Sequence, residues 1–257
     1  MLGIMNHNEE WLWCISGKHP VAKDYFSLGA ENPLFKAFSD WAGNGYMKWL
    51  TQSNRGVSRN SWRFWAKGSK KNQLICGIVK DSGDQFGRLY PLLIMGSGSL
   101  KDWESQWDLL PLALDNIWEK MEYLSINRRL SNLKQLEEEI LQLQGPSNDW
   151  PAWKALQEQS YPMMHGHLYE TLSKGLNDFW KSSDCLIALN NHFLSEPLKI
   201  TETYHALLKD RLPIVPNTVF MGGVPETTRI GIFGRALAPE DFVKLWSPET
   251  TSLIGRF

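Results

Sequence analysis

Cysteine is scarce in this sequence, and no long apolar run occurs in it. The three cysteines, Cys14, Cys76 and Cys185, are odd in number, widely spaced and set in apolar segments, which indicates buried free thiols in a reducing compartment. No apolar run approaches the roughly 20 residues that span a bilayer, and the N-terminus lacks the regions of a signal peptide. We therefore expect a cytoplasmic protein without a membrane span.

The sequence also lacks an excess of either charge. It has 27 basic and 28 acidic residues, so no broad electrostatic field would attract nucleic acid or an anionic membrane. Aromatic residues are abundant, with 13 Trp, 11 Phe and 7 Tyr, and such residues dominate both cores and interfaces. Partners of the protein or small-molecule class are therefore expected.

Strand-like segments occur near both ends of the chain, with helical periodicity between them. We expect a single domain over residues 1–257, with a helical insertion at about 103–181, folded as a three-layer α/β/α sandwich around a mixed, largely antiparallel sheet. The expected strands are 11–16, 61–66, 73–79, 88–95, 185–189, 217–221 and 229–234. The expected helices are 33–50, 103–124, 128–144, 150–160, 165–180 and 239–246.

Five charged residues interrupt the aromatic-rich, strand-like segments. Lys18 and Asp24 follow the first strand, Arg63 lies within a run of Trp and Phe, and Asp84 and Arg88 are four residues apart. We predict one buried polar cluster in which Asp84 pairs with Arg63 or Arg88. Buried ionisable groups suit ligand binding or proton transfer, but they also form structural salt bridges. Because no nucleophile and base accompany them, a structural or recognition role is favoured over a catalytic one.

Three other motifs do not predict a cofactor or metal site. Gly17-Lys18 fails as a phosphate loop because position 12 is Leu and His19 replaces the required Ser or Thr. His165-Gly166-His167 has no Cys or carboxylate partner nearby, so no metal is expected there. Gly96-Ser97-Gly98-Ser99 lacks the dinucleotide-binding spacing and is typical of a linker after a strand.

Two features could form a protein interface. The leucine-rich stripe over residues 130–143 favours an intramolecular core face, with a partner-helix role as the alternative. Trp150 and Trp153 flank Pro151 in an expected loop, where exposed aromatic rings would mark a binding surface.

Taken together, the three charged segments resemble the TagF family, also called ImpM, of accessory proteins of bacterial type VI secretion systems. Gly17-Lys18-His19-Pro20 with Asp24-Tyr25-Phe26 is similar to the family's Gly-Lys-x-Pro-x-x-x-Asp-Phe motif, and Trp62-Arg63-Phe64 to its Trp-Arg-Phe motif. Residues 77–92 align without a gap onto its third motif, with Asp81 replacing Pro and Tyr90 replacing Phe. The matches there are Ser82, Asp84, Gly87, Arg88, Pro91 and Leu92.

The resemblance covers about residues 11–125, and a weaker similarity is found at 218–223. It implies an α/β/α sandwich and a cytoplasmic post-translational regulator, commonly a repressor, that acts through a forkhead-associated scaffold protein. We therefore expect a non-enzymatic binding protein without a cofactor.

Two alternatives stay open. Grouped Lys and Arg suit anions, so the cluster could be the pocket of an anion- or phosphopeptide-binding enzyme. The protein could also be a structural subunit of the secretion apparatus.

Overall fold

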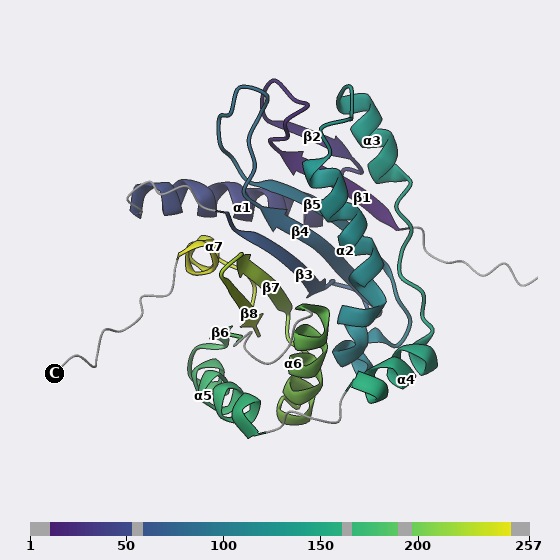
Figure 1. The fold of residues 1–257 in the computed structure, drawn as a ribbon, viewed down its shortest axis with the longest axis vertical. Coiled ribbons are helices and arrows are strands. Elements are labelled where there is room, and N and C mark those ends of the chain that lie inside the picture. Colours follow the sequence, from purple (N-terminus) through teal and green to yellow (C-terminus); the bar gives the residue numbers. More distant parts are fainter. Residues whose placement is uncertain (1–10, 53–58, 161–165, 190–196, 248–257) are drawn as a thin grey trace, which may run out of the picture.

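The computed structural model describes residues 11–52, 59–160, 166–189 and 197–247, which form an α/β sandwich around one eight-stranded sheet (Figure 1). The strands lie in the order β2-β1-β5-β4-β3-β7-β8-β6. The expected sandwich is confirmed, with one correction. Every pairing between these described strands is antiparallel, where a mixed, largely antiparallel sheet was expected.

The strands are β1 (Leu12–Gly17), β2 (Phe26–Gly29), β3 (Ser61–Lys67), β4 (Gln73–Lys80), β5 (Leu92–Ser99), β6 (Asp184–Ala188), β7 (Thr218–Val224) and β8 (Thr227–Phe233). The helices are α1 (Pro33–Gln52), α2 (Leu110–Ile126), α3 (Leu133–Leu141), α4 (Trp150–Ser160), α5 (Gly166–Ser182), α6 (Pro197–Arg211) and α7 (Pro239–Trp246). Two short 3-10 turns, Trp103–Ser105 and Trp107–Leu109, precede α2.

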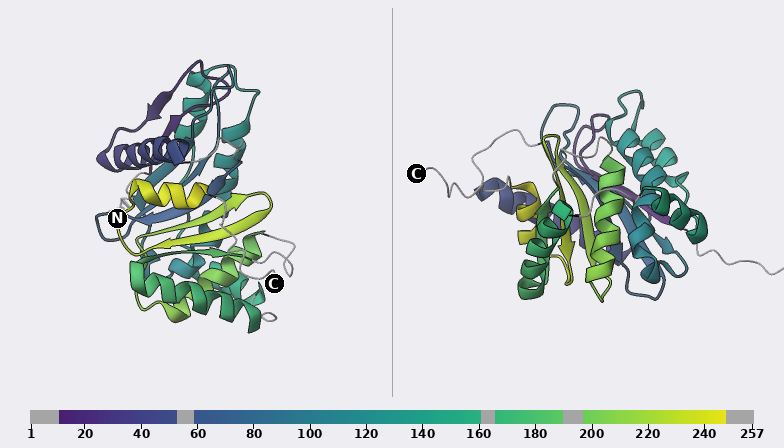
Figure 2. Two further views of the ribbon diagram at one scale, coloured as in Figure 1. Left: turned by 90° about the vertical axis from the view of Figure 1, so that its left-hand side faces the viewer. Right: turned by 60° about the horizontal axis from the view of Figure 1, so that its bottom comes forward.

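Helices cover both faces of the sheet. In Figure 1, α2, α3 and α6 lie in front of the strands, and α1 and α7 lie behind them, as the side views of Figure 2 confirm. Side chains that alternate along each strand therefore enter two different cores. On β3, for example, Trp65 is buried in the front core and Trp62 and Phe64 are buried in the rear core. Burial on both faces explains the near-continuous apolar runs of the central strands.

The two ends of the chain share the same sheet, as expected. β3 pairs with β7 in a register that joins Ser61 to Gly223 and Ala66 to Thr218. The expected hairpin is also present, because β4 and β5 pair through the turn that begins at Asp81. The sheet thus brings the loops after β1 and β4 to one end of the molecule (Figure 1).

The Gly-Ser segment at 96–99 is not a linker, which corrects the prediction. It lies within β5, where a Cβ atom on Gly96 would approach the Trp13 ring to 2.1 Å and one on Gly98 would approach the Trp11 ring to 2.6 Å. Small residues are therefore required there because two tryptophan rings pack directly on the strand.

Local signals predicted several helices correctly. The Asn32 side chain caps α1 by accepting the amide of Leu34 at 2.7 Å, and α7 matches its predicted bounds. Pro111 lies in the first turn of α2, so the helix begins there and is not kinked. The stripe at 130–143 is part of the front core, which confirms its interpretation as a core face.

All three cysteines are buried free thiols, as predicted. Burial raises the pKa of Cys14 and Cys185 to about 12. No helix in the described part of the chain is long and apolar enough to cross a membrane. The His165-Gly166-His167 motif, at which no metal was expected, includes His165, which lies outside the described residues. Within the described ranges, no group of three His, Cys, Asp or Glu residues is arranged to hold a metal ion.

Candidate functional site

Four of the five predicted charged residues meet where the β1–β2 loop contacts the β4–β5 loop. We call Lys18, Asp24, Asp84 and Arg88 the loop clamp. Its centre is Asp84, whose side chain is fully buried and whose Oδ2 accepts Nε of Arg88 at 2.7 Å and Nζ of Lys18 at 3.2 Å. The predicted pairing of Asp84 with Arg88 is therefore present.

The other oxygen of Asp84 orders its own loop. Oδ1 accepts the backbone amides of Phe86 and Arg88, each at 3.0 Å, so the carboxylate closes the turn around Gly87. Gly87 has a φ of 77°, in the left-handed region that favours glycine. Burial acts to raise the pKa of Asp84, but the amides and the two cations outweigh this effect and lower the pKa to about 2.

Further bonds join the two loops. Asp24 lies 3.2 Å from the Arg88 guanidinium and 3.9 Å from Nζ of Lys18. The same guanidinium donates to the backbone oxygen of Lys23 at 2.6 Å. The amide of Tyr25 is the main cause of the lowered pKa of Asp24, followed by the charges of Arg88 and Lys18. The clamp therefore fixes the positions of both loops relative to each other.

Arg63 does not belong to the loop clamp, so the prediction of one cluster of five residues is wrong. Its guanidinium contacts Asp115 at 2.7 Å and Glu122 at 2.7 Å, both on α2, and lies 5.7 Å from the centre of the Trp118 ring. The reason is the strand alternation, which directs Arg63 to the face of β3 that α2 covers. Sequence reasoning missed Asp115 and Glu122, although their spacing of seven residues places them on one helix face.

The clamped loops carry three exposed apolar side chains that sequence reasoning missed. Phe86, Leu89 and Tyr25 are 66%, 61% and 47% exposed. We call these three residues the loop surface. The Arg88 guanidinium lies 5.6 Å from the centre of the Phe86 ring, and Tyr25 packs edge-on against Tyr90 at 5.5 Å. Their positions in the sequence could have indicated this surface, because each of the three residues lies next to, or between, the charged residues of the motifs.

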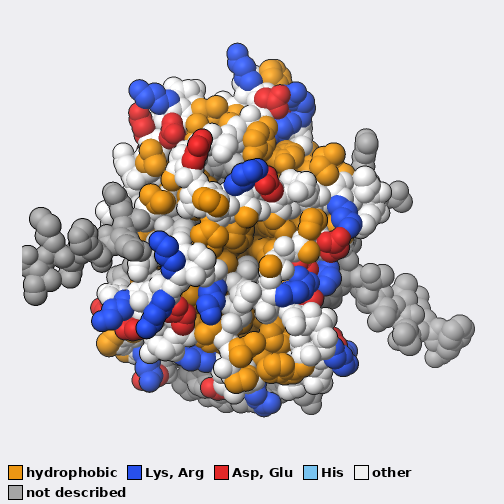
Figure 3. All heavy atoms as spheres, turned by 180° about the vertical axis from the view of Figure 1, so that it is seen from behind, with side chains coloured by type: hydrophobic (Ala, Val, Ile, Leu, Met, Phe, Trp, Pro, Cys, Tyr) orange, Lys and Arg blue, Asp and Glu red, His pale blue; other side chains and the backbone are white. Residues whose placement is uncertain are grey.

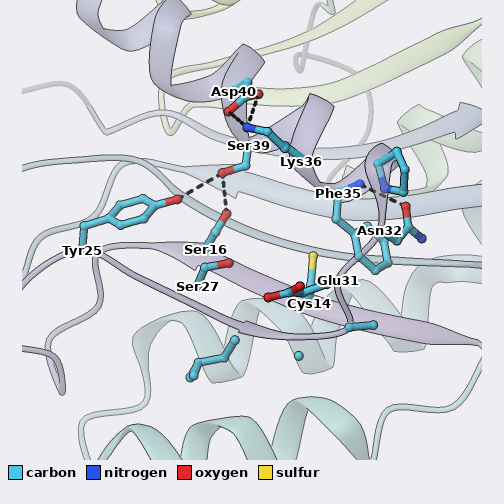
Figure 4. Close-up of a pocket in the computed structure, with 14 residues that line it drawn as sticks. Cys14, Ser16, Tyr25, Ser27, Glu31, Asn32, Phe35, Lys36, Ser39 and Asp40 are labelled. Carbon is cyan, nitrogen blue, oxygen red and sulfur yellow. Dashed lines mark hydrogen bonds and ion pairs between the residues drawn. The ribbon is translucent and has the colours of Figure 1, made fainter.

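A cavity of about 680 Å³ lies between α1 and the β1–β2 hairpin (Figure 4). Figure 4 shows Ser39, Lys36 and Asp40 of α1 on one side of it and Ser16, Ser27 and Cys14 of the strands on the other. Ser39 Oγ is linked to Ser16 Oγ at 3.1 Å and to the Tyr25 hydroxyl at 3.2 Å. The lining thus includes the hydroxyl groups of Ser16, Tyr25, Ser27 and Ser39, and the cavity has the size of a typical ligand site.

A smaller hollow of about 270 Å³ is lined by α1, by β3 and β4, and by the segment before α7. Its apolar walls include Leu34, Phe38, Trp41 and Leu237. Figure 3 views the molecule from behind, the side on which α1 lies, and shows hydrophobic side chains gathered near the middle of this face.

Trp150 and Trp153 do not form the predicted exposed loop surface. Both lie in α4 and are half-buried, and Trp150 packs against the front core and donates from Nε1 to the backbone oxygen of Lys101 at 3.0 Å. The helix is the one expected over 150–160, and Asp149 caps it, since its Oδ1 accepts the amide of Ala152 at 3.3 Å.

A second charged network, which the sequence analysis did not predict, fixes α7 against the end of the sheet. Arg235 donates to both oxygens of the buried Asp241, at 2.7 and 2.8 Å, and to Asp184 at 3.0 Å. Lys244 also contacts Asp184, at 2.5 Å. These pairs join β6 to α7 and have a structural role in the fold.

The fold and the clamped loops define an α/β sandwich protein with an antiparallel sheet and a buried ionic cluster between two loops. The TagF N-terminal domain, described as type VI secretion system-associated, matches residues 14–143, half of the chain. The chain belongs to the TagF family.

One solved structure supports the fold along nearly the whole chain. The crystal structure of PA0076 from Pseudomonas aeruginosa PAO1 superposes with a TM-score of 0.53 at 15% identity, covering 95% of this chain and 99% of that chain. No curated protein sequence matches the chain.

Proposed function

We propose that this protein is a cytoplasmic post-translational regulator of type VI secretion, a repressor, that acts by binding a component of the secretion system. The observation that carries the proposal is the loop surface, in which Tyr25, Phe86 and Leu89 are exposed on loops held by the buried Asp84. Exposed aromatic and aliphatic side chains are typical anchors of protein interfaces. Loops that are already ordered lose less entropy on binding, which favours affinity.

The charges of the clamp favour a protein interface over an anion pocket. Lys18 is only 12% exposed at its side chain and contacts Asp84, and Arg88 contacts both Asp84 and Asp24. A phosphate group would therefore have to compete with two carboxylates for the same cations. Because the cations of the clamp are already paired with carboxylates, we assign partner recognition to the neighbouring apolar side chains of the loop surface.

The partner that we propose is a forkhead-associated scaffold protein of the same secretion system, which the family resemblance implies. The test is binding of the full-length chain to the purified scaffold protein, comparing wild type with Phe86→Ser and Leu89→Ser. Loss of an interface anchor typically weakens binding by about tenfold or more, so each variant should lose at least that much. Ile214→Ser is the matched control, because Ile214 is 48% exposed in the segment between α6 and β7.

Measurements of secretion test the proposed regulatory role. Overproduction of the wild-type chain should lower secretion, and overproduction of Phe86→Ser should not. The proposal fails if no secretion component binds and deletion leaves secretion unchanged. Stoichiometric incorporation into the assembled apparatus would instead identify a structural subunit.

A further inference from the structure

The free edge of β2 presents unpaired main-chain groups. β2 is one edge of the sheet. The Ala30 amide donates to the Trp13 oxygen, and Leu28 is the register partner of Ile15. These two observations show which residues of the segment turn their main-chain groups towards β1. By the alternation of an antiparallel ladder, the amides and carbonyls of Ser27 and Gly29 point away from β1. The Gly29 amide donates to Glu137 Oε1 at 3.4 Å. On that side, the Ser27 main chain has no hydrogen bond to a described residue.

Two of the usual protections of an edge strand, charge and proline, are missing from β2. Its four residues, Phe26–Gly29, include no charge and no proline, which are common means of blocking strand addition. The opposite edge is different, because β6 begins with Asp184, which is paired with Arg235 and Lys244. The β2 edge therefore lacks the charges found at the β6 edge, and its protection is limited to its short length and to the bond from the Gly29 amide to Glu137.

The cavity of Figure 4 lies directly beside this edge. The residue pairs Cys14 with Gly29 and Ser16 with Ser27 lie on the same face of the sheet and line the cavity opposite α1. Side chains of a strand alternate between the two faces, so every second side chain of a strand added to β2 would point to this face. The cavity of about 680 Å³ has room for such a side chain.

The charges around the cavity favour a basic side chain. The lining includes the carboxylates of Glu31 and Asp40 and one ammonium group, that of Lys36, which already contacts Asp40 at 2.9 Å. Glu31 has no ion pair with a described residue. The amides at the start of α1 are also occupied, because Asn32 Oδ1 accepts those of Leu34 and Phe35. These two amides and the Lys36 ammonium group are therefore occupied, whereas a Lys or Arg side chain would meet the Glu31 carboxylate.

We infer that the free edge of β2 binds an extended segment of a partner protein by strand addition, with a Lys or Arg side chain of that segment in the cavity beside α1. The segment pairs with the main chain of Ser27, and its ammonium or guanidinium group contacts Glu31. The inference extends the proposed binding role from the loop surface to the neighbouring edge of the sheet; Tyr25 belongs to both, whereas Phe86 and Leu89 do not line the cavity. It is tested without the scaffold protein.

The experiment selects binders from a displayed library of random dodecapeptides on the full-length chain. The selected peptides should be rich in β-branched residues and carry Lys or Arg. Their affinity is then measured for Ser27→Pro, which removes the outward amide, and for Ser27→Ala, which removes only the hydroxyl. Proline is tolerated on edge strands where the amide faces outward. We expect binding to Ser27→Pro to be roughly tenfold weaker than to wild type and binding to Ser27→Ala to be unchanged.

Two further measurements do not depend on the proline variant being folded. Peptide binding should slow hydrogen exchange at the Ser27 amide, and Glu31→Lys should weaken binding by roughly tenfold through charge reversal. Phe86→Ser should bind the peptides as wild type does. The proposal for the loop surface and the inference for the β2 edge are therefore tested separately. The inference is overturned if no peptide is selected, if folded Ser27→Pro binds as tightly as wild type, or if exchange at Ser27 does not change.

Discussion

At the scale of single residues, Asp84 connects two loops that are far apart in sequence. Its two oxygens have different partners, since one accepts backbone amides of its own loop and the other contacts Lys18 and Arg88. The carboxylate thus couples the turn at Gly87 to the loop after β1. Loss of this one charge should disorder both loops.

We predict that the contribution of Asp84 to stability depends on acid pH. The pKa of Asp84 falls from its ordinary value of 3.8 to about 2 in the folded protein, so the unfolded chain binds the proton more readily between these values. The stabilisation is fully present above pH 3.8 and is lost as the pH falls towards 2. Urea unfolding of wild type and Asp84→Asn should therefore differ at neutral pH and converge near pH 2. A difference that stays constant across this range would contradict the prediction.

His205 should produce a pH dependence closer to neutrality. The ring is fully buried, accepts Nε1–H of Trp65 at 3.1 Å and is bonded to the oxygen of Thr201 at 2.8 Å. Burial is the main cause that lowers the pKa of His205 from 6.5 to about 4. The unfolded chain binds this proton first, so stability should fall as the pH drops from 6.5 to 4, by up to about 1.4 kcal/mol per pH unit.

The measurement is the free energy of urea unfolding between pH 4 and pH 7 for wild type and His205→Gln. The variant should have a shallower pH dependence in this interval. A residual slope is expected from His19, whose pKa burial also lowers. Equal slopes in wild type and variant would show that His205 is not responsible.

At the scale of elements, the sequence predicted best what local signals determine. The turn after β4, the Asn32 cap of α1 and Pro111 at the start of α2 are all short-range features, and each was found where expected. β2 was missed because four residues give no clear alternation, and it forms by pairing with β1. α6 was missed because its buried side includes polar residues such as Glu202 and His205, which obscure an apolar period.

In the candidate site, too, the short-range contacts were predictable from the sequence and the long-range contacts were not. The pairing of Asp84 with Arg88 spans four residues and was predictable, and the agreement of three motifs added Lys18 and Asp24. The partners of Arg63 depend on how α2 packs on β3, which the sequence does not show. The partial burial of Trp150 depends on how α4 packs on the front core, which the sequence does not show either.

The close packing of tryptophan on β5 gives a third prediction. A Cβ atom on Gly96 would lie 2.1 Å from the Trp13 ring, so Gly96→Ala should destabilise the protein by about 1–3 kcal/mol in chemical denaturation. Gly83→Ala is the control, because its nearest atom would be 3.4 Å away and a change within about 0.5 kcal/mol is expected. Equal effects of the two substitutions would refute the packing argument.

At the scale of the whole molecule, the sheet crosses the boundary of the matched family region. Residues 14–143 contain β3, whose partner β7 lies in the remaining part of the chain. The rear core likewise combines Phe64 from the first part with Phe220 and Phe242 from the second. Neither part has a complete core on its own.

We therefore predict one cooperative unfolding transition for the full chain. Tryptophan fluorescence and far-ultraviolet circular dichroism should give coincident denaturation curves. A fragment of residues 1–143 should aggregate, because it exposes the edge of β3 and part of the rear core. Two separate transitions, or a soluble fragment with native-like dichroism, would contradict this view.

The pairing of β3 with β7 also has a consequence during synthesis of the protein. β3 leaves the ribosome early, whereas its neighbour β7 lies near the other end of the chain. At ordinary rates of translation, the interval between them is on the order of ten seconds. For that time the nascent chain holds an apolar strand without its neighbour, which should make it a client of ribosome-associated chaperones.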